Sequence, residues 1–131
     1  MMEAFYKIDN YPFDQQVMEK NLSQFLSEDE FGRIWLIEAD RQLAGYIILT
    51  FGYSFEYGGR DAFIDEFFIV EGYRHQGIGN ATLQFVLNEA PNLHIKALHL
   101  EVEKHNQAGN SLYRKHAFKT GNRTLMTRKL S

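Results

Sequence analysis

The sequence contains no cysteine, and this absence removes several kinds of chemistry at once. Without a thiol the chain forms no disulfide, offers no thiolate ligand to a metal and has no cysteine nucleophile. No stretch approaches the roughly 18 apolar residues that span a bilayer. The segment from Met1 to Lys7 also lacks the apolar run of a signal peptide. We therefore expect a cytoplasmic protein that does not bind membranes.

An excess of charge of either sign is missing as well. The 131 residues include 14 Lys and Arg against 17 Asp and Glu, a net charge of −3. This balance gives no overall field that attracts a phosphate backbone, so a nucleic-acid partner is not expected. Low-complexity segments, internal repeats and Pro/Gly/Ser-rich linkers are absent too. Residues 1–131 are therefore expected to form a single domain with one core.

The first half of the chain has the periodicities of one helix and three strands. Asp14 is a candidate N-cap, and apolar residues recur after it at helical spacing until about Ser27. Two apolar runs at residues 34–37 and 43–51 flank a short polar segment, as in a hairpin. A third, well-buried strand is expected at residues 62–70 because of its β-branched and aromatic content.

The second half alternates helices and strands. We expect a helix from Ile78 to Pro91, a strand at residues 97–102, a helix at residues 108–116 and a closing antiparallel strand at residues 123–130. A right-handed crossover should make the strands around Phe67 and Leu100 parallel. The predicted fold class is α/β (α+β), with a mixed, mostly antiparallel sheet flanked by helices.

A glycine-rich loop joins the third strand to the next helix. Gly77 and Gly79 stand where backbone N–H groups have no intrahelical partner and the helix dipole favours an anion. Arg74 adds a forked cation that suits phosphate oxygens. The loop lacks the Walker lysine and, with Thr82 in place of a third glycine, the full dinucleotide fingerprint. A pyrophosphate cradle and a plain strand-to-helix turn both remain open at this point.

The loop Arg74-x-x-Gly77-x-Gly79, following a strand, resembles the central acetyl-CoA motif of the GNAT superfamily of N-acetyltransferases. A second segment is similar to that superfamily's next strand, asparagine and tyrosine-bearing helix, with Asn106 and Tyr113 at the matching places. The resemblance extends over roughly residues 35–118. It implies a GNAT-like sheet with its parallel strand pair at the acetyl-CoA cleft, acetyl-CoA as co-substrate and no metal.

The resemblance also implies which residues bind acetyl-CoA. Asn106 would bond the pantetheine arm, and Tyr113 would contact the sulfur. A main-chain N–H near Phe68 or Ile69 would stabilise the oxyanion. The end of the strand and the loop would hold the rest of the molecule, through Phe68, Ile69, Val70, Arg74, His75, Gln76, Gly77, Ile78, Gly79 and Asn80.

Acetyl transfer to an amine needs a base, because an ordinary alkylamine is protonated at neutral pH. The resemblance implies that this base lies at or near Glu66, sometimes acting through water. Side chains alternate along a strand, so only one of Asp65 and Glu66 should face the cleft. We favour Glu66 and keep Asp65 as the rival. Tyr113 is the candidate general acid for the thiolate, since a phenol and a thiol have similar pKa values.

Both residues have simpler interpretations, a solvated strand end for Glu66 and a core aromatic for Tyr113. Tyr53 and Glu56, on the loop before the third strand, are candidates for the substrate rim together with Asp65 and Glu66, although an ordinary polar loop explains them equally well.

The alternative function is a non-catalytic acyl-CoA-binding module. The sequence leaves the acceptor amine open.

Two features depart from the family pattern. Only 13 residues precede Asp14, too few for the usual first strand and helix, so the N-terminus should be abbreviated. Ala117 replaces a common glycine, and alanine is strained there if the backbone needs a positive φ. The edge strands and short N-terminus make a homodimer plausible.

Overall fold

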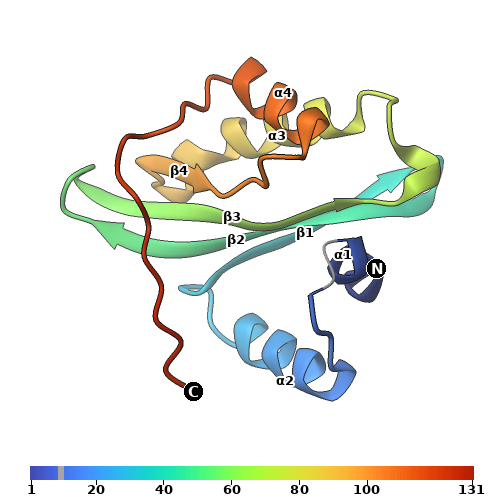
Figure 1. The fold of residues 1–131 in the computed structure, drawn as a ribbon, viewed down its shortest axis with the longest axis horizontal. Helices are drawn as coiled ribbons and strands as arrows, with labels where there is room; N and C mark the ends of the chain where they lie inside the picture. Colours follow the sequence, from blue (N-terminus) through green and yellow to red (C-terminus); the bar gives the residue numbers. More distant parts are fainter. Residues whose placement is uncertain (9–10) are drawn as a thin grey trace.

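The computed structural model describes residues 1–8 and 11–131. Its four strands form one sheet in the order β1-β2-β3-β4, with helices on both faces (Figure 1). In chain order the elements are α1 (Met2–Ile8), α2 (Gln15–Leu26), β1 (Gly32–Ala39), β2 (Gln42–Ser54), β3 (Gly59–Ile69), the 3-10 turn η1 (Glu71–Tyr73), α3 (Ile78–Glu89), η2 (Ala90–Leu93), β4 (Ala97–Leu100) and α4 (Gln107–Lys115). No helix among the described residues is long and apolar enough to cross a membrane.

The predicted helix and hairpin of the first half are confirmed. The Asp14 carboxylate accepts a hydrogen bond from the Val17 N–H at 3.1 Å, as an N-cap should, and α2 follows. Strands β1 and β2 are antiparallel. Asp40 and Arg41 connect them with φ values of 52° and 63°. Two consecutive positive φ angles are typical of the tight turn whose twist matches a two-stranded hairpin.

The parallel pairing of β3 with β4 is confirmed, and within it Leu100 pairs with Ile64. The strand β4 ends at Leu100, whereas β3 continues to Ile69. Beyond Ile64, β3 therefore has one edge that β4 does not cover. We call the region where the two strands part the fork.

A β-bulge lies in β3 at the fork. Ile48 pairs with Glu66 and Leu49 pairs with Ile64, so Asp65 is an extra residue without a partner on β2. The bulge shifts the alternation of side chains. Ile64 belongs to the core cluster beneath α3, whereas Phe68 packs on the opposite face, beneath α1.

The sheet has a hydrophobic cluster on each face. On one face Ile47, Leu49 and Ile64 contact Leu83 and Val86 of α3, with residues of α4 packed around them. On the other face Tyr46, Ile48 and Phe68 are covered by Met2 and Phe5 of α1 and Phe25 of α2. The helices thus form two outer layers around the sheet (Figure 1).

Both ends of the described structure differ from the sequence prediction. The described N-terminal residues form α1, which the sequence did not predict, and no strand among them precedes β1. The predicted closing strand at residues 123–130 is wrong, because residues 118–131 form neither helix nor strand. A strand needs a neighbour for its backbone hydrogen bonds. The tail instead passes the β2–β3 hairpin, where Arg123 bonds Glu56 (Figure 1).

Candidate active site

A cavity of about 510 Å³ opens at the fork, and we call it the fork cavity. Its walls come from α1, from the middle of β3, from the end of β4 with the segment that follows, and from α4. The described lining residues are Phe5, Tyr6, Tyr11, Ile64, Asp65, Glu66, Phe67, Leu100, Glu101, Val102, Glu103, Asn106 and Tyr113. Four of the predicted site residues, Asp65, Glu66, Asn106 and Tyr113, are thus together in one cavity.

Glu66 is a buried carboxylate with 9% of its surface exposed. The Tyr6 hydroxyl donates to its Oε2 at 2.8 Å, and the Tyr46 hydroxyl donates to its Oε1 at 2.8 Å. Burial raises the pKa of Glu66 above its usual value, and the two hydroxyl donors oppose that rise. A carboxylate with a raised pKa, in a cavity, has the properties of a general base.

Asp65 lines the same cavity as Glu66, contrary to the expectation that only one of the two would face the cleft. The alternation rule fails here because Asp65 is the bulged residue. Partial burial raises the pKa of Asp65 as well. The two carboxylates differ in their partners, since Glu66 accepts two tyrosine hydroxyls and is the more buried of the pair.

Tyr113 extends from α4 into the fork cavity. The residue is half-buried, and this burial raises the pKa of its phenol. Its ring meets the Phe118 ring edge to face, with centroids 5.9 Å apart. This packing fixes the ring on the α4 side of the cavity, across the fork from β3.

Asn106 is the N-cap of α4. Its Oδ1 accepts a hydrogen bond from the Gly109 N–H at 2.9 Å. A Cβ on Gly109 would stand 2.6 Å from the Asn106 Nδ2, so this glycine makes room for the capping side chain. The cap therefore uses the side-chain carbonyl of Asn106 and not its amide N–H groups.

The backbone of β3 exposes hydrogen-bonding groups along its uncovered edge. The Val70 N–H donates to the Ala44 carbonyl at 2.7 Å. In an antiparallel ladder alternate residues face the partner strand, so the backbone of Phe68 also faces β2. The N–H groups of Phe67 and Ile69 then point toward the fork. Of the two predicted positions for the oxyanion donor, Phe68 and Ile69, the ladder leaves the N–H of Ile69 available.

The glycine loop leads directly into α3. Gly77 is its N-cap, with a left-handed φ of 82°, and His75 also has a positive φ of 63°. A Cβ on Gly77 would meet nothing within 4 Å, whereas one on Gly79 would lie 3.2 Å from Leu112. Gly77 is thus needed for its backbone conformation, and Gly79 for close packing against α4. The first N–H groups of α3 have no intrahelical acceptor and can bind an anion.

Arg74 uses one of its N–H donors for a hydrogen bond within the protein. Its Nε donates to the Ile69 carbonyl at 2.8 Å, and its Cζ stands 5.5 Å from the centre of the Phe68 ring. These contacts hold the guanidinium at the end of β3. In the first turn of α3, the Asn80 side chain is bonded to His116 at 2.7 Å. Arg74 still has four N–H donors for a phosphate.

Tyr53 and Glu56, the other predicted substrate residues, are not among the lining residues of the fork cavity. They belong to the β2–β3 hairpin, where Tyr53 pairs with Arg60. Six residues of strand separate Arg60 from Glu66, or about 20 Å. Glu56 accepts two hydrogen bonds from Arg123 at 2.9 and 3.0 Å. The geometry gives no support to a role for this pair in the fork cavity.

Several cavity residues were missed in the sequence. Glu101 lies within the predicted strand at residues 97–102 and Glu103 directly follows it, so the sequence signal was a pair of acidic side chains beside the predicted cleft. The Tyr11 hydroxyl donates to Glu103 at 2.7 Å. No local pattern could have indicated Tyr6 and Tyr46, because they lie 60 and 20 residues from Glu66.

The sequence pattern of the acetyltransferase (GNAT) family matches residues 1–118. The chain belongs to this family. Members transfer an acetyl group from acetyl-CoA, so this chain is an acetyl-CoA-dependent acetyltransferase by family. The four-stranded sheet with its parallel β3–β4 pair agrees with that assignment.

Solved structures share the fold of this GNAT chain. An integron cassette protein from the mobile metagenome of Cole Harbour Salt Marsh is 32% identical, with a TM-score of 0.88 over 99% of this chain and 80% of that one. A possible acetyltransferase from Clostridium difficile 630 is 18% identical, with a TM-score of 0.84 over 98% and 86%. A predicted acetyltransferase with acetyl-CoA from Clostridium acetobutylicum is 20% identical, with a TM-score of 0.72 over 89% and 77%. No curated protein matches the chain.

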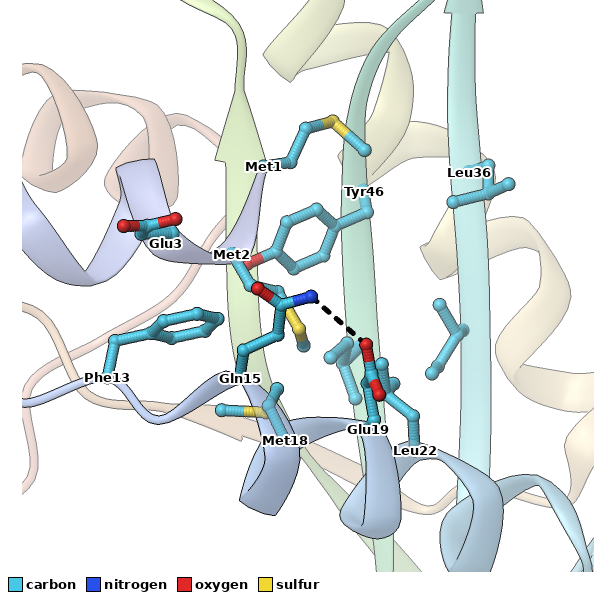
Figure 2. Close-up of a pocket in the computed structure, with 12 residues that line it drawn as sticks. Met1, Met2, Glu3, Phe13, Gln15, Met18, Glu19, Leu22, Leu36 and Tyr46 are labelled. Atoms are coloured by element: carbon cyan, nitrogen blue, oxygen red, sulfur yellow. Dashed lines mark hydrogen bonds between the residues drawn. The ribbon is translucent and has the colours of Figure 1, made fainter.

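A second cavity, of about 420 Å³, lies between the N-terminal helices and the sheet, and we call it the α2 cavity (Figure 2). Its lining is mostly apolar, with Glu3, Gln15 and Glu19 as its polar members. Gln15 donates to Glu19 at 3.1 Å. The other described lining residues are Met1, Met2, Phe13, Met18, Leu22, Ile34, Leu36, Tyr46 and Ile48.

Proposed function

We propose that this protein transfers the acetyl group of acetyl-CoA directly to a primary amine in the fork cavity, with Glu66 as general base and Tyr113 as general acid. The observation that supports this most strongly is their convergence: a buried carboxylate from β3 and a phenol from α4 line one cavity beside an uncovered strand edge. Base, acid and oxyanion donors are the three groups that direct acyl transfer requires.

The proposed reaction has one tetrahedral intermediate. The neutral amine nitrogen attacks the thioester carbonyl, and its proton passes to Glu66 directly or through a water. The N–H groups of Phe67 and Ile69 are the candidate donors to the oxyanion. As the intermediate collapses, the C–S bond breaks, the new amide forms and Tyr113 protonates the leaving sulfur. Asp65 shares the cavity and is the rival base.

Acetyl-CoA would be held at two places. Its pyrophosphate would meet the first N–H groups of α3 and the guanidinium of Arg74, across the loop from residue 74 to residue 80. Its pantetheine arm would follow the uncovered edge of β3 toward Asn106. This path ends at the fork, where the thioester would lie between Glu66 and Tyr113.

The charges of the fork cavity favour a cationic acceptor. Asp65, Glu66, Glu101 and Glu103 supply carboxylates, and the described lining residues include no lysine, arginine or histidine. A cleft lined by negative charges, in surroundings of low dielectric constant, concentrates cations and raises their rate of association. An amine, protonated when it arrives, fits such a cavity better than an anionic or neutral acceptor does.

Calorimetric titration with acetyl-CoA tests the cofactor site. We expect saturable binding by the parent and at least tenfold weaker binding by the Arg74→Ala, Gly77→Ala double variant, because two contributions to phosphate binding are lost. Binding without thiol release for any amine would favour the alternative function, a non-catalytic acyl-CoA-binding module. Undetectable binding by the folded parent would overturn the proposed use of the loop.

Tyr113→Phe separates binding from chemistry. The variant should bind acetyl-CoA as the parent does, because the ring and its packing against Phe118 remain. Its rate of amine-dependent thiol release should fall by roughly 10²-fold if the phenol protonates the sulfur. An unchanged rate would remove Tyr113 from the mechanism.

Three further expectations remain predictions: one catalytic domain over residues 1–131, a cytoplasmic location and a homodimer.

The homodimer has a candidate contact. Three apolar residues of the C-terminal tail are exposed and favour a contact with a second chain: Leu125, Met126 and Leu130. Sedimentation equilibrium of the full chain measures its mass in solution, and a monomer at all concentrations would exclude the dimer.

A further inference from the structure

The Glu66 carboxylate is held from two directions. Tyr6 of α1 donates to one oxygen and Tyr46 of β2 donates to the other, each at 2.8 Å. The two tyrosines lie on different elements and converge on the same side chain. This arrangement leaves the carboxylate plane little freedom to rotate, because each oxygen has its own fixed donor.

The burial of the three residues makes these hydrogen bonds strong. Tyr46 is 3% exposed and Glu66 is 9% exposed, while Tyr6 is half-buried. An ionised carboxylate is costly to bury unless donors satisfy it. Burial, together with the neighbouring carboxylate, raises the pKa of both phenols, so the hydroxyls remain protonated donors throughout the working pH range.

We propose that Tyr6 and Tyr46 are positioning residues for acetyl transfer, which fix the Glu66 carboxylate in the fork cavity and keep it ionised. The proposal rests on the assignment of Glu66 as the base. Each carboxylate oxygen has two lone pairs and uses one for a tyrosine, so the other can accept the proton of the amine or of a bridging water. The N-terminal helix α1 thereby becomes part of the catalytic apparatus.

The neighbouring carboxylate of Asp65 acts in the opposite sense. Asp65, next to it on β3, raises the pKa of Glu66 through its negative charge. Glu101 and Glu103 face the same cavity from the segment after β4, with Tyr11 and, from α4, Tyr113. In this negative surrounding the two tyrosine donors are the described groups that favour the ionised form of Glu66.

The pH dependence of kcat/KM tests the proposal in Tyr6→Phe and Tyr46→Phe variants. Loss of one donor should move the acidic limb upward by about one pH unit, because a hydrogen bond to a charged group is worth about that much. The shift should be larger for Tyr46→Phe, whose bond is more buried. Activity should recover at a pH above the shifted limb, and the KM for acetyl-CoA should stay within twofold of the parent value.

The matched control is Tyr73→Phe. This variant also loses one tyrosine hydroxyl bond, from Tyr73 to Gln42 at 3.0 Å, but the bond lies outside the fork cavity. Its acidic limb should coincide with that of the parent. If Tyr6 and Tyr46 only anchor α1 and the sheet, their variants will lower the melting temperature without moving the limb, and that result would overturn the proposal.

A second measurement distinguishes this proposal from the function on which it rests. Carboxyl ¹³C NMR of glutamate-labelled protein, with the Glu66 signal assigned by Glu66→Gln, follows the titration without any substrate. An NMR midpoint that rises in both tyrosine variants supports the proposal, and an unmoved midpoint overturns it even in a fully active enzyme. A midpoint that moves while the kinetic limb stays in place would instead show that Glu66 is not the base, and the positioning role in acetyl transfer would fail together with that assignment, leaving Asp65 as the candidate base.

Discussion

The two cavities of this protein have similar sizes and opposite chemistry. The fork cavity, of about 510 Å³, is lined by carboxylates and tyrosines, whereas the α2 cavity, of about 420 Å³, is lined mostly by methionine and aliphatic side chains. Tyr46 belongs to both regions, because its side chain lines the α2 cavity while its hydroxyl bonds Glu66. The fork cavity is therefore proposed as the reaction site for its convergent polar groups with raised pKa values, and not for its volume.

Replacing a glutamate by glutamine in each cavity should reveal the largest difference between the two cavities. Glu66→Gln should lower kcat/KM by roughly 10²- to 10⁴-fold, because a general base is lost. Glu19→Gln in the α2 cavity should leave kcat/KM unchanged. Steady-state assays of thiol release compare the two variants. Equal, small effects would mean that neither carboxylate takes part in chemistry.

Glu66→Gln should also change stability in a pH-dependent way. Burial raises the folded-state pKa of Glu66 above its ordinary 4.5. The contribution of Glu66 to the free energy of unfolding is therefore largest at low pH, where the carboxyl group is protonated. It is lost as the pH rises through the folded-state pKa. Relative to Glu66→Gln, the parent should become less stable between pH 4 and neutrality. Urea unfolding at several pH values gives the sign directly.

Removing the outer carboxylates of the fork cavity should have a smaller effect on catalysis. In a Glu101→Gln, Glu103→Gln variant, kcat/KM for a diamine should fall by about tenfold and that for a monoamine of equal chain length by less, because the second cation loses its partners. Glu3→Gln in the α2 cavity is the control. An equal loss for both amines would mean that these carboxylates do not select a second positive charge.

A truncation in the α2 cavity should affect folding and not chemistry. Leu22→Ala removes apolar surface that is only half-buried, so it should lower the free energy of unfolding by about 1 kcal/mol. Denaturant titration measures this loss, and kcat/KM should be unaltered. A change in acceptor preference in this variant would show that the apolar cavity also binds substrate.

The smallest expected effect lies outside both cavities. Ala117 has a φ of 68°, so the strain expected from the sequence is present. Ala117→Gly should relieve part of the roughly 1–2 kcal/mol cost of a left-handed alanine. The greater freedom of glycine in the unfolded chain offsets some of this, so the free energy of unfolding should rise by about 0.5 kcal/mol. Thermal unfolding detects it as a slightly higher Tm. A lower Tm would mean that contacts of the Ala117 methyl group outweigh the strain.

The elements that the sequence predicted well depend on local rules. Asp14 caps α2 through its own side chain, and Gly77 adopts the left-handed conformation that a strand-to-helix turn requires. The prediction of residues 123–130 as a strand failed because alternation within a segment does not supply the neighbouring strand that it needs. The prediction that only one of Asp65 and Glu66 faces the cleft failed for a similar reason, since a bulge depends on the pairing of two strands.

The sequence by itself determined the family of this protein, the glycine loop before α3 and the candidate acid and base, because each depends on residues close together in the chain. Only the tertiary structure decided which groups surround Glu66. Tyr6 and Tyr46 reach it from α1 and β2, and Glu101 and Glu103 join it where β4 ends. The physical reason is that strand register and helix packing bring distant residues together, and no local periodicity encodes those contacts.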